Sequence, residues 1–221
     1  MLDHRTRYLQ IAFNYDISLV RHILPRIPAS SNILIEAGTP FIKREGLRGL
    51  YEMRRMWGGL IVADMKINDG AVNEVDMARQ SGADAVTISG SAPIETVNLA
   101  IERCEQVNLI SMVDLLGIDE PLHVFRAMRH KPGAAVLHLG RDEENTTGKL
   151  IQYRHINRIH SKYSTLIAAA GGVGLKEAHS AIFNGVNIVI VNLVHPGDNW
   201  NGISTQEDIP SIVNEFLETM A

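Results

Sequence analysis

Acidic and basic side chains gather shortly after one apolar stretch of the chain. Residues 60–63 are typical of a buried strand, and Asp64, Lys66 and Asp69 follow them. Asp64 and Lys66 share one face of an extended segment, and Asp69 lies past its end, beside Gly70. Charges there are costly to bury unless they pair or hold a ligand. The pattern indicates a salt-bridged strand end or a reactive site, and we favour the site.

A further carboxylate, Glu36, ends the preceding apolar stretch, 32–35. Glu36 and Asp64 are expected to end neighbouring strands, where two carboxylates repel unless a proton or a cation lies between them. Carboxylate oxygens suit Mg²⁺, which takes one or two carboxylates and keeps several waters. The residues therefore predict a Mg²⁺ site at Glu36 and Asp64. The alternative is that Glu36 pairs with Lys66 and no metal binds.

Two basic side chains, Lys66 and His138, are candidates for proton transfer. Flanking carboxylates at Asp64 and Asp69 would keep Lys66 protonated, which predicts a proton donor or electrostatic stabiliser rather than a Schiff-base lysine. His138 ends the apolar run 134–137. It is either a satisfied core residue or, at a strand end, a base or proton shuttle.

A pair of glycines, Gly171 and Gly172, follows the alanine run 168–170. Their backbone amides are able to approach an anion at a helix start, although any tight turn would use the same pair. Arg141, three residues after His138, is either a second phosphate contact or a surface charge.

Regular alternation of strands and helices must position these residues. The expected strands are 8–13, 32–35, 60–66, 85–89, 109–115, 134–139, 166–170 and 187–191. The expected helices are 17–27, 43–57, 72–80, 93–105, one opened by Pro121, 151–160, 176–184 and 209–220, with a polar loop over 141–148. The alternation predicts an α/β protein with a parallel sheet, a single (β/α)8 TIM barrel domain over residues 1–221. An open doubly wound sheet is the alternative, but it leaves two edges to protect.

The carboxyl ends of barrel strands form one mouth, where active sites lie. The residues expected there are Asn14, Glu36, Asp64, Lys66, Asp114, His138, Arg141, Gly171, Gly172 and Asn192. Because these polar groups cluster at one end, we favour an enzyme over a barrel kept for assembly or regulation.

Composition narrows the setting of the protein. The chain has 221 residues, 45% hydrophobic and 21% charged, with a net charge of −4. That balance gives no reason to expect nucleic acid or an anionic membrane as a partner. The single cysteine, Cys104, excludes an internal disulfide and suits a reducing compartment. With no signal-peptide core and no long apolar run, we expect a cytoplasmic protein.

Taken together, the motifs resemble the orotidine monophosphate decarboxylase suprafamily. They are Asp64-x-Lys66-x-x-Asp69, the segments 81–87 and 113–117, and His138-x-Gly140-x-Asp142, and the resemblance runs from Leu9 to Val191. Orotidine decarboxylases carry a lysine where Glu36 stands; a glutamate there is similar to 3-hexulose-6-phosphate synthase and 3-keto-L-gulonate-6-phosphate decarboxylase. Val113-Asp114-Leu115 and His138-Leu139-Gly140 look more like the synthase, whereas Arg141 looks more like the decarboxylase.

The resemblance implies an enediolate made from a sugar phosphate and stabilised by Mg²⁺ at Glu36 and Asp64. Lys66 would steady the enediolate oxygen and His138 would move protons. The family is dimeric, and Asp69 would reach into the partner's site. The substrate would lie against Asn14, Asp114, Arg141, Gly171, Gly172, Asn192 and Leu193.

Two positions depart from the family's pattern. Asn14 replaces an aspartate, and Asn192-Leu193 replaces Gly-Gly or Gly-Arg in the phosphate loop. We therefore expect weak binding of ribulose 5-phosphate, or a substrate whose anion is held partly by Arg141. The leading hypothesis is a lyase of the hexulose-phosphate synthase type. A decarboxylase of a 3-keto sugar-acid phosphate is second, and a divergent member with another substrate is third.

Overall fold

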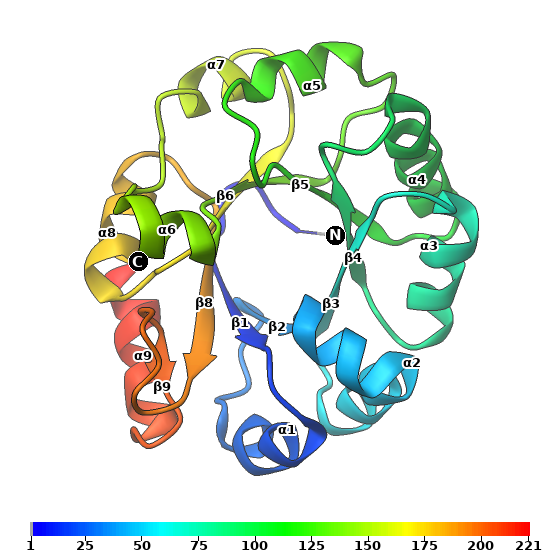
Figure 1. The fold of residues 1–221 in the computed structure, drawn as a ribbon. Coiled ribbons are helices and arrows are strands. Elements are labelled where there is room, and N and C mark those ends of the chain that lie inside the picture. Colours follow the sequence, from blue (N-terminus) through cyan, green and yellow to red (C-terminus); the bar gives the residue numbers. More distant parts are fainter. Residues whose placement is uncertain (1) are drawn as a thin grey trace.

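A closed barrel of parallel strands lies at the centre of the computed structural model, which describes residues 2–221 (Figure 1). Neighbouring strands pair in chain order, and β1 also pairs with β8, which closes the ring. The barrel strands are β1 (Tyr8–Phe13), β2 (Ile33–Ala37), β3 (Leu60–Ile67), β4 (Ala85–Ser89), β5 (Ile110–Asp114), β6 (Ala134–His138), β7 (Leu166–Ala170) and β8 (Ile188–Val194). The predicted (β/α)8 barrel is confirmed, while its being the only domain stays a prediction.

Helices surround the barrel and connect successive strands (Figure 1). They are α1 (Ile17–Ile23), α2 (Thr39–Met56), α3 (Ala71–Gln80), α4 (Ile94–Gln106), α5 (Pro121–Ala127), α6 (Arg141–Thr147), α7 (Ile156–His160), α8 (Leu175–Phe183) and α9 (Ile209–Thr219). A short strand, β9 (Ile203–Ser204), pairs with the end of β8. None of the helices in residues 2–221 has the length and apolar character needed to span a bilayer.

Alternation along each strand separates two apolar layers. The larger layer lies between the barrel and its helices, and the smaller one fills the barrel interior. The interior is narrow, and alanines such as Ala12, Ala85, Ala134 and Ala168 supply much of it. At the carboxyl ends of the strands the inward positions become polar. Gln10, Glu36, Asp64, Thr87 and Asp114 are all buried there.

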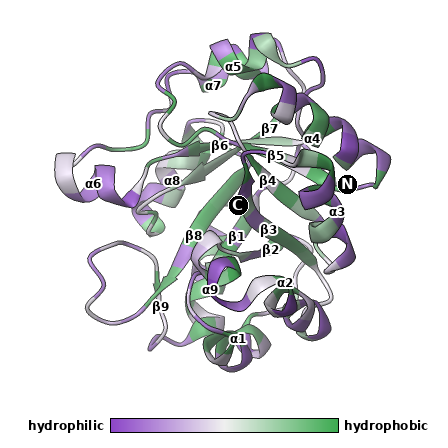
Figure 2. Cartoon of the chain, turned by 45° about the vertical axis from the view of Figure 1, so that its right-hand side comes forward, coloured by the Kyte–Doolittle hydropathy of each residue, from purple (hydrophilic) through white to green (hydrophobic). Residues whose placement is uncertain are grey.

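The segment 141–148 differs from the sequence prediction. A polar loop was the expectation, which is wrong: residues 141–147 form α6. The first turn of α6 carries three acidic residues, Asp142, Glu143 and Glu144, whose negative charge stabilises the positive end of the helix dipole. The helix ends at Gly148, which adopts the left-handed conformation. No residue of α6 is buried, and Figure 2 shows it as a largely hydrophilic segment outside the barrel. The helix predicted over 151–160 is also shorter, spanning only α7.

Candidate active site

A cavity of about 610 Å³ opens at the carboxyl ends of the strands. Its walls include Gln10 and nine of the residues predicted from the sequence: Asn14, Glu36, Asp64, Lys66, Asp114, His138, Arg141, Gly171 and Asn192. Of the residues predicted from the sequence, Asp69, Gly172 and Leu193 are the three that do not line it. The barrel thus brings together side chains from most of its strands, as expected for the mouth of this fold.

Asp64 is held by hydroxyl groups from both sides. The Thr39 hydroxyl, at the start of α2, donates to a carboxylate oxygen of Asp64 at 2.7 Å, and the Thr39 amide approaches the same oxygen at 3.3 Å. The Thr87 hydroxyl of β4 donates to the other oxygen at 2.8 Å. Because both oxygens are fixed, the carboxylate presents a defined face to Lys66 and to the cavity.

Lys66 lies at an irregular point of β3. The β3–β4 register shifts between Ala63 and Ile67, and Lys66 adopts a left-handed backbone with φ of 49°. Its amide donates to the Thr87 hydroxyl at 2.8 Å. Its ammonium donates to Asp64 at 2.9 Å and to Asp114 at 2.5 Å. A left-handed backbone costs roughly 1–2 kcal/mol for an L-residue, and this network holds it in place.

The two carboxylates determine the charge of Lys66. Burial opposes the ammonium form, yet Asp64 and Asp114 raise the pKa of Lys66 above its ordinary value. The sequence prediction named Asp69 as the second flanking carboxylate, which is wrong within one chain: Asp69 is exposed and Asp114 takes that place. Lys66 is therefore a fixed cation at neutral pH, poised to stabilise negative charge or to donate a proton.

Asp114 links Lys66 to His138. The Nδ1 atom of His138 lies 2.9 Å from a carboxylate oxygen of Asp114, and the Leu116 amide donates to the other oxygen at 2.9 Å. Burial alone would raise the pKa of Asp114, but His138 and Lys66 hold it well below its usual range. A carboxylate on Nδ1 orients the ring and leaves Nε2 for a ligand in the cavity.

Glu36 is a buried carboxylate whose ionised form is disfavoured by its surroundings. Burial, followed by the charge of Asp64, raises the pKa of Glu36 to about 8, against a partial offset from the Gln10 amide. That amide donates to Glu36 at 2.5 Å, while its carbonyl oxygen Oε1 is buried without a hydrogen-bond partner. Residues 2–221 show no Glu36–Lys66 ion pair, because Lys66 is taken by Asp64 and Asp114.

This donor set fits Mg²⁺. Two carboxylates and an unpartnered amide oxygen are hard ligands, and a divalent cation would relieve the repulsion between Glu36 and Asp64. The described residues contain no group of three or more His, Cys, Asp or Glu side chains able to hold a metal. Two carboxylates suffice for Mg²⁺, which completes its octahedron with water and substrate oxygens.

The wall formed by the ends of β1 and β8 and by the start of α6 carries amides and a guanidinium. The side-chain oxygen of Asn192 accepts from the Asn14 amide at 2.9 Å and from Arg141 at 3.5 Å. Arg141 also lies over the Trp200 ring, 4.4 Å from its centroid. Stacking on Trp200 fixes the guanidinium at the cavity wall, where it is available to an anion.

A glycine turn closes this end of the cavity. Gly171 and Gly172 have φ values of 109° and 57°, a conformation that favours glycine. Across residues 2–221, no hydrogen bond joins the amides of Gly172 or Val173 to another protein group. The turn leads into α8, so its free amides lie at a helix start, an arrangement that is able to receive an anion.

Leu193 contradicts its sequence assignment. Its side chain is 1% exposed and belongs to the apolar layer outside the barrel, because Leu193 is out of phase with the inward Asn192. Leu193 therefore does not offer a side chain to a substrate in the cavity.

Replacing Leu193 by arginine tests this placement. We expect Leu193→Arg to lower the free energy of unfolding by about 3 kcal/mol or more, because it buries an unpaired charge in a packed layer. Denaturant titration measures the change, with the exposed Leu150→Arg as control, since Leu150 is 72% exposed. An unchanged unfolding midpoint in Leu193→Arg would place that side chain in water.

Three residues that position the site were not singled out from the sequence. Gln10 interrupts an apolar strand in phase with the inward positions, and that phase was the available signal. Thr39 and Thr87 hold Asp64 through contacts between elements that lie far apart in the sequence. No local pattern identifies such contacts.

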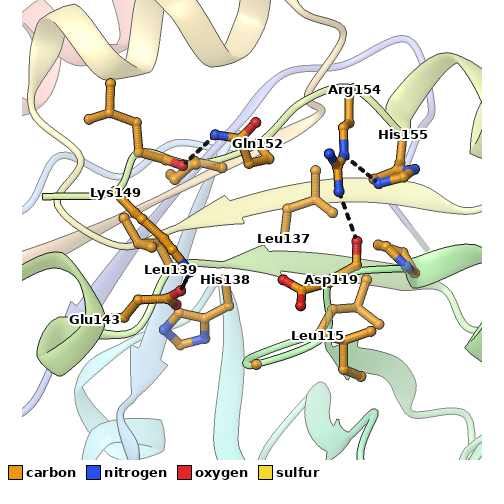
Figure 3. A pocket seen from close by; sticks show the side chains of 15 residues that line it. Leu115, Asp119, Leu137, His138, Leu139, Glu143, Lys149, Gln152, Arg154 and His155 are labelled. Carbon is orange, nitrogen blue, oxygen red and sulfur yellow. Dashed lines mark hydrogen bonds and ion pairs between the residues drawn. The ribbon is translucent and has the colours of Figure 1, made fainter. Parts of the chain in front are cut away.

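A second cavity, of about 470 Å³, adjoins the first at Gly117, His138, Leu139 and Glu143, which line both (Figure 3). Polar side chains on its walls hydrogen-bond to one another. Lys149 donates to Glu143 at 2.6 Å, and Arg154 donates to the His155 ring at 2.9 Å. Of these two contacts, only Lys149–Glu143 is an ion pair.

The chain is similar in sequence to known enzymes and similar in fold to solved structures. It is 34% identical over 215 residues to the bifunctional enzyme Fae/Hps of Methanothrix thermoacetophila and 35% identical over 214 residues to that of Methanocaldococcus jannaschii. These matches cover 96% of this chain but 52% of each relative, so the chain spans about half their length.

Solved structures share the fold. A 3-hexulose-6-phosphate synthase from Salmonella typhimurium superposes with a TM-score of 0.84 at 22% identity, covering 96% of this chain and 98% of that one. KGPDC from Streptococcus mutans, solved in complex with D-R5P, superposes with a TM-score of 0.76 at 20% identity, covering 97% of each chain.

The family assignment rests on the sequence match. The model of the family described as Orotidine 5'-phosphate decarboxylase / HUMPS matches residues 7–192, which include every strand of the barrel up to the middle of β8. That match confirms the resemblance found in the motifs. The chain belongs to the Orotidine 5'-phosphate decarboxylase / HUMPS family.

Proposed function

We propose that this chain is a carbon–carbon lyase of the 3-hexulose-6-phosphate synthase type, joining formaldehyde to ribulose 5-phosphate or reversing that addition. The observation that carries the proposal is the line Asp64–Lys66–Asp114–His138, a fixed cation and an oriented imidazole held by two carboxylates beside Glu36. The similarity to the Fae/Hps enzymes, which covers about half the length of each of them, supports the same reaction.

The chain's own residues would divide the chemistry as follows. His138, through Nε2, would take a proton from the carbon next to the substrate's ketone, giving an enediolate. Lys66 would stabilise the enediolate oxygen, since its charge is fixed by Asp64 and Asp114. The enediolate carbon would then bond to the formaldehyde carbon, and the new alkoxide would take a proton back from the protonated His138.

Glu36 and Asp64 would hold Mg²⁺ in this reaction, with the Gln10 carbonyl nearby. Bound there, the ion would supply Lewis-acid stabilisation to the substrate's oxygens. Arg141 and the Gly171–Gly172 turn would receive the phosphate.

A decarboxylase of a 3-keto sugar-acid phosphate is the second candidate. The observation favouring it is Arg141, which lines the cavity three residues after His138, as in that branch of the family. Loss of CO₂ would leave the same enediolate, which Lys66 would stabilise and which a proton from the site would quench.

A coupled test separates the two candidates. Purified protein with Mg²⁺ is incubated with ribulose 5-phosphate and formaldehyde, and separately with 3-keto-L-gulonate 6-phosphate. Consumption of formaldehyde with formation of a six-carbon sugar phosphate supports the synthase, while release of CO₂ from the second substrate supports the decarboxylase. EDTA should stop either reaction. Absence of both activities would refute the proposal.

A homodimer with shared active sites is part of the proposal. Asp69 lies outside its own chain's cavity, in the motif Asp64-x-Lys66-x-x-Asp69, and would reach a partner's site. We expect Lys66→Ala and Asp69→Ala to be inactive alone, and mixed dimers to regain up to about a quarter of wild-type activity, because random pairing gives half of the dimers one intact site. Activity is measured after mixing the denatured variants and refolding them. Mixed dimers that remain inactive would indicate a site contained within one chain.

A further inference from the structure

The anion site at the Gly171–Gly172 turn contains a side chain of the protein itself. Glu144, from α6, places its carboxylate against Gly172 so closely that a Cβ on Gly172 would lie 2.7 Å from the Glu144 carboxyl carbon. One oxygen of that carboxylate, Oε2, is buried and has no hydrogen-bond partner. A carboxylate thus lies where the fold offers amides and a helix start to an anion.

Few interactions retain Glu144 in this position. The helix that carries it buries no residue, so a movement of α6 breaks little apolar packing. One contact connects α6 to the loop that follows β8, the stacking of Trp200 on Arg141 at the start of α6. The same loop contacts the glycine turn, where the Asn201 amide donates to the Gly172 carbonyl at 3.4 Å.

That loop also approaches the barrel closely. A Cβ on Gly202 would lie 2.9 Å from the Val194 side chain, so the return of the loop over β8 depends on glycine. The loop 195–202 and α6 therefore close over Gly172 from two sides.

We propose that Glu144 is a specificity-determining residue that competes with the substrate's phosphate for the Gly171–Gly172 turn. The anionic end of the substrate binds when α6 withdraws this carboxylate, and Arg141 on the same helix stays available to pair with the incoming anion. The inference rests on the proposed function in taking this turn as the phosphate site.

The competition has a measurable consequence. A ligand's apparent affinity is reduced by the fraction of time its site is open. If Glu144 occupies the turn about nine times in ten, its removal strengthens binding about tenfold. Glu144→Gln keeps the shape and removes the charge, and Glu144→Ala removes both.

The test is titration calorimetry of the full chain with inorganic phosphate. We expect the Kd to fall about tenfold in Glu144→Gln and in Glu144→Ala relative to the wild type. Glu143→Gln is the matched control, since Glu143 is the adjacent acid of α6 and turns instead toward Lys149 (Figure 3). Its Kd should stay within about twofold of the wild type, because the Glu143 carboxylate is paired with Lys149 and does not lie against Gly172.

Hydrogen exchange gives a second readout. Phosphate should speed exchange in residues 141–148 of the wild type by releasing α6, and should have little effect there in Glu144→Gln. Unchanged phosphate affinity in both Glu144 variants, or an equal gain in Glu143→Gln, would overturn the inference. Because phosphate binding needs no carbon chemistry, this result is independent of whether the lyase assay succeeds.

Discussion

Lys66→Ala should reduce kcat/KM by about 10³-fold, the loss typical of removing one preorganised group that stabilises developing charge. Lys66 carries the fixed positive charge of the site, at 2.9 Å from Asp64 and 2.5 Å from Asp114. Most of the loss should fall on kcat, because the charge that Lys66 opposes develops in the transition state. Steady-state kinetics with the substrate identified by the coupled assay measures it.

The same substitution should destabilise the fold. Without Lys66, the buried carboxylates of Asp64 and Asp114 lose their cation. Removing one partner of a buried ion pair lowers the free energy of unfolding by about 3–5 kcal/mol. Lys66→Gly is the matched variant, because glycine accepts the left-handed backbone at this residue, with its φ of 49°. It should be as inactive as Lys66→Ala and about 1 kcal/mol more stable. Wild-type kcat in either variant would remove Lys66 from the mechanism.

The barrel was predictable because its signal is local and repeated. Apolar runs of strand length alternate with amphipathic helices, and each strand of the structure falls within a few residues of its predicted position. The helix α6 gave no such signal. It buries no residue, so it has no apolar stripe, and only its acidic first turn and Gly148 indicate a helix.

The polar residues of the site were predictable because they follow apolar strands at inward positions. Their partners were not. Lys66 of β3 reaches Asp114 of β5 past the intervening strand β4, at a point where the β3–β4 register shifts. The spacing of residues along the chain predicts neither the register shift nor this contact. Leu193 was misassigned from its place in a family motif, although the period of two puts it opposite Asn192. Glu144 reaches Gly172 only because α6 folds back over the mouth.

Glu36 should make the metal-free protein less stable as the pH rises. Its pKa is raised from 4.5 to about 8 in the folded state, so between these values the folded state keeps a proton that the unfolded state has lost. The stabilisation is complete below about pH 4.5 and is lost as the pH rises through about 8, with a limiting slope of about 1.4 kcal/mol per pH unit. Thermal unfolding in EDTA from pH 5 to 9 measures this trend.

Glu36→Gln should flatten that pH dependence and abolish the effect of Mg²⁺. The amide keeps the shape of the side chain without a titrating charge, so the metal-free variant should be the more stable protein at pH 8. In the wild type, Mg²⁺ should raise Tm more at pH 8 than at pH 6, because the ion binds the deprotonated carboxylate and must displace a proton at the lower pH. Glu95→Gln, which removes an exposed carboxylate of α4, serves as the control and should behave like the wild type. If Mg²⁺ raises the Tm of Glu36→Gln as much as that of the wild type, Glu36 is not a metal ligand. The raised pKa would then reflect only its burial beside Asp64, and Lys66 would have to stabilise the enediolate without a metal ion at the neighbouring Asp64.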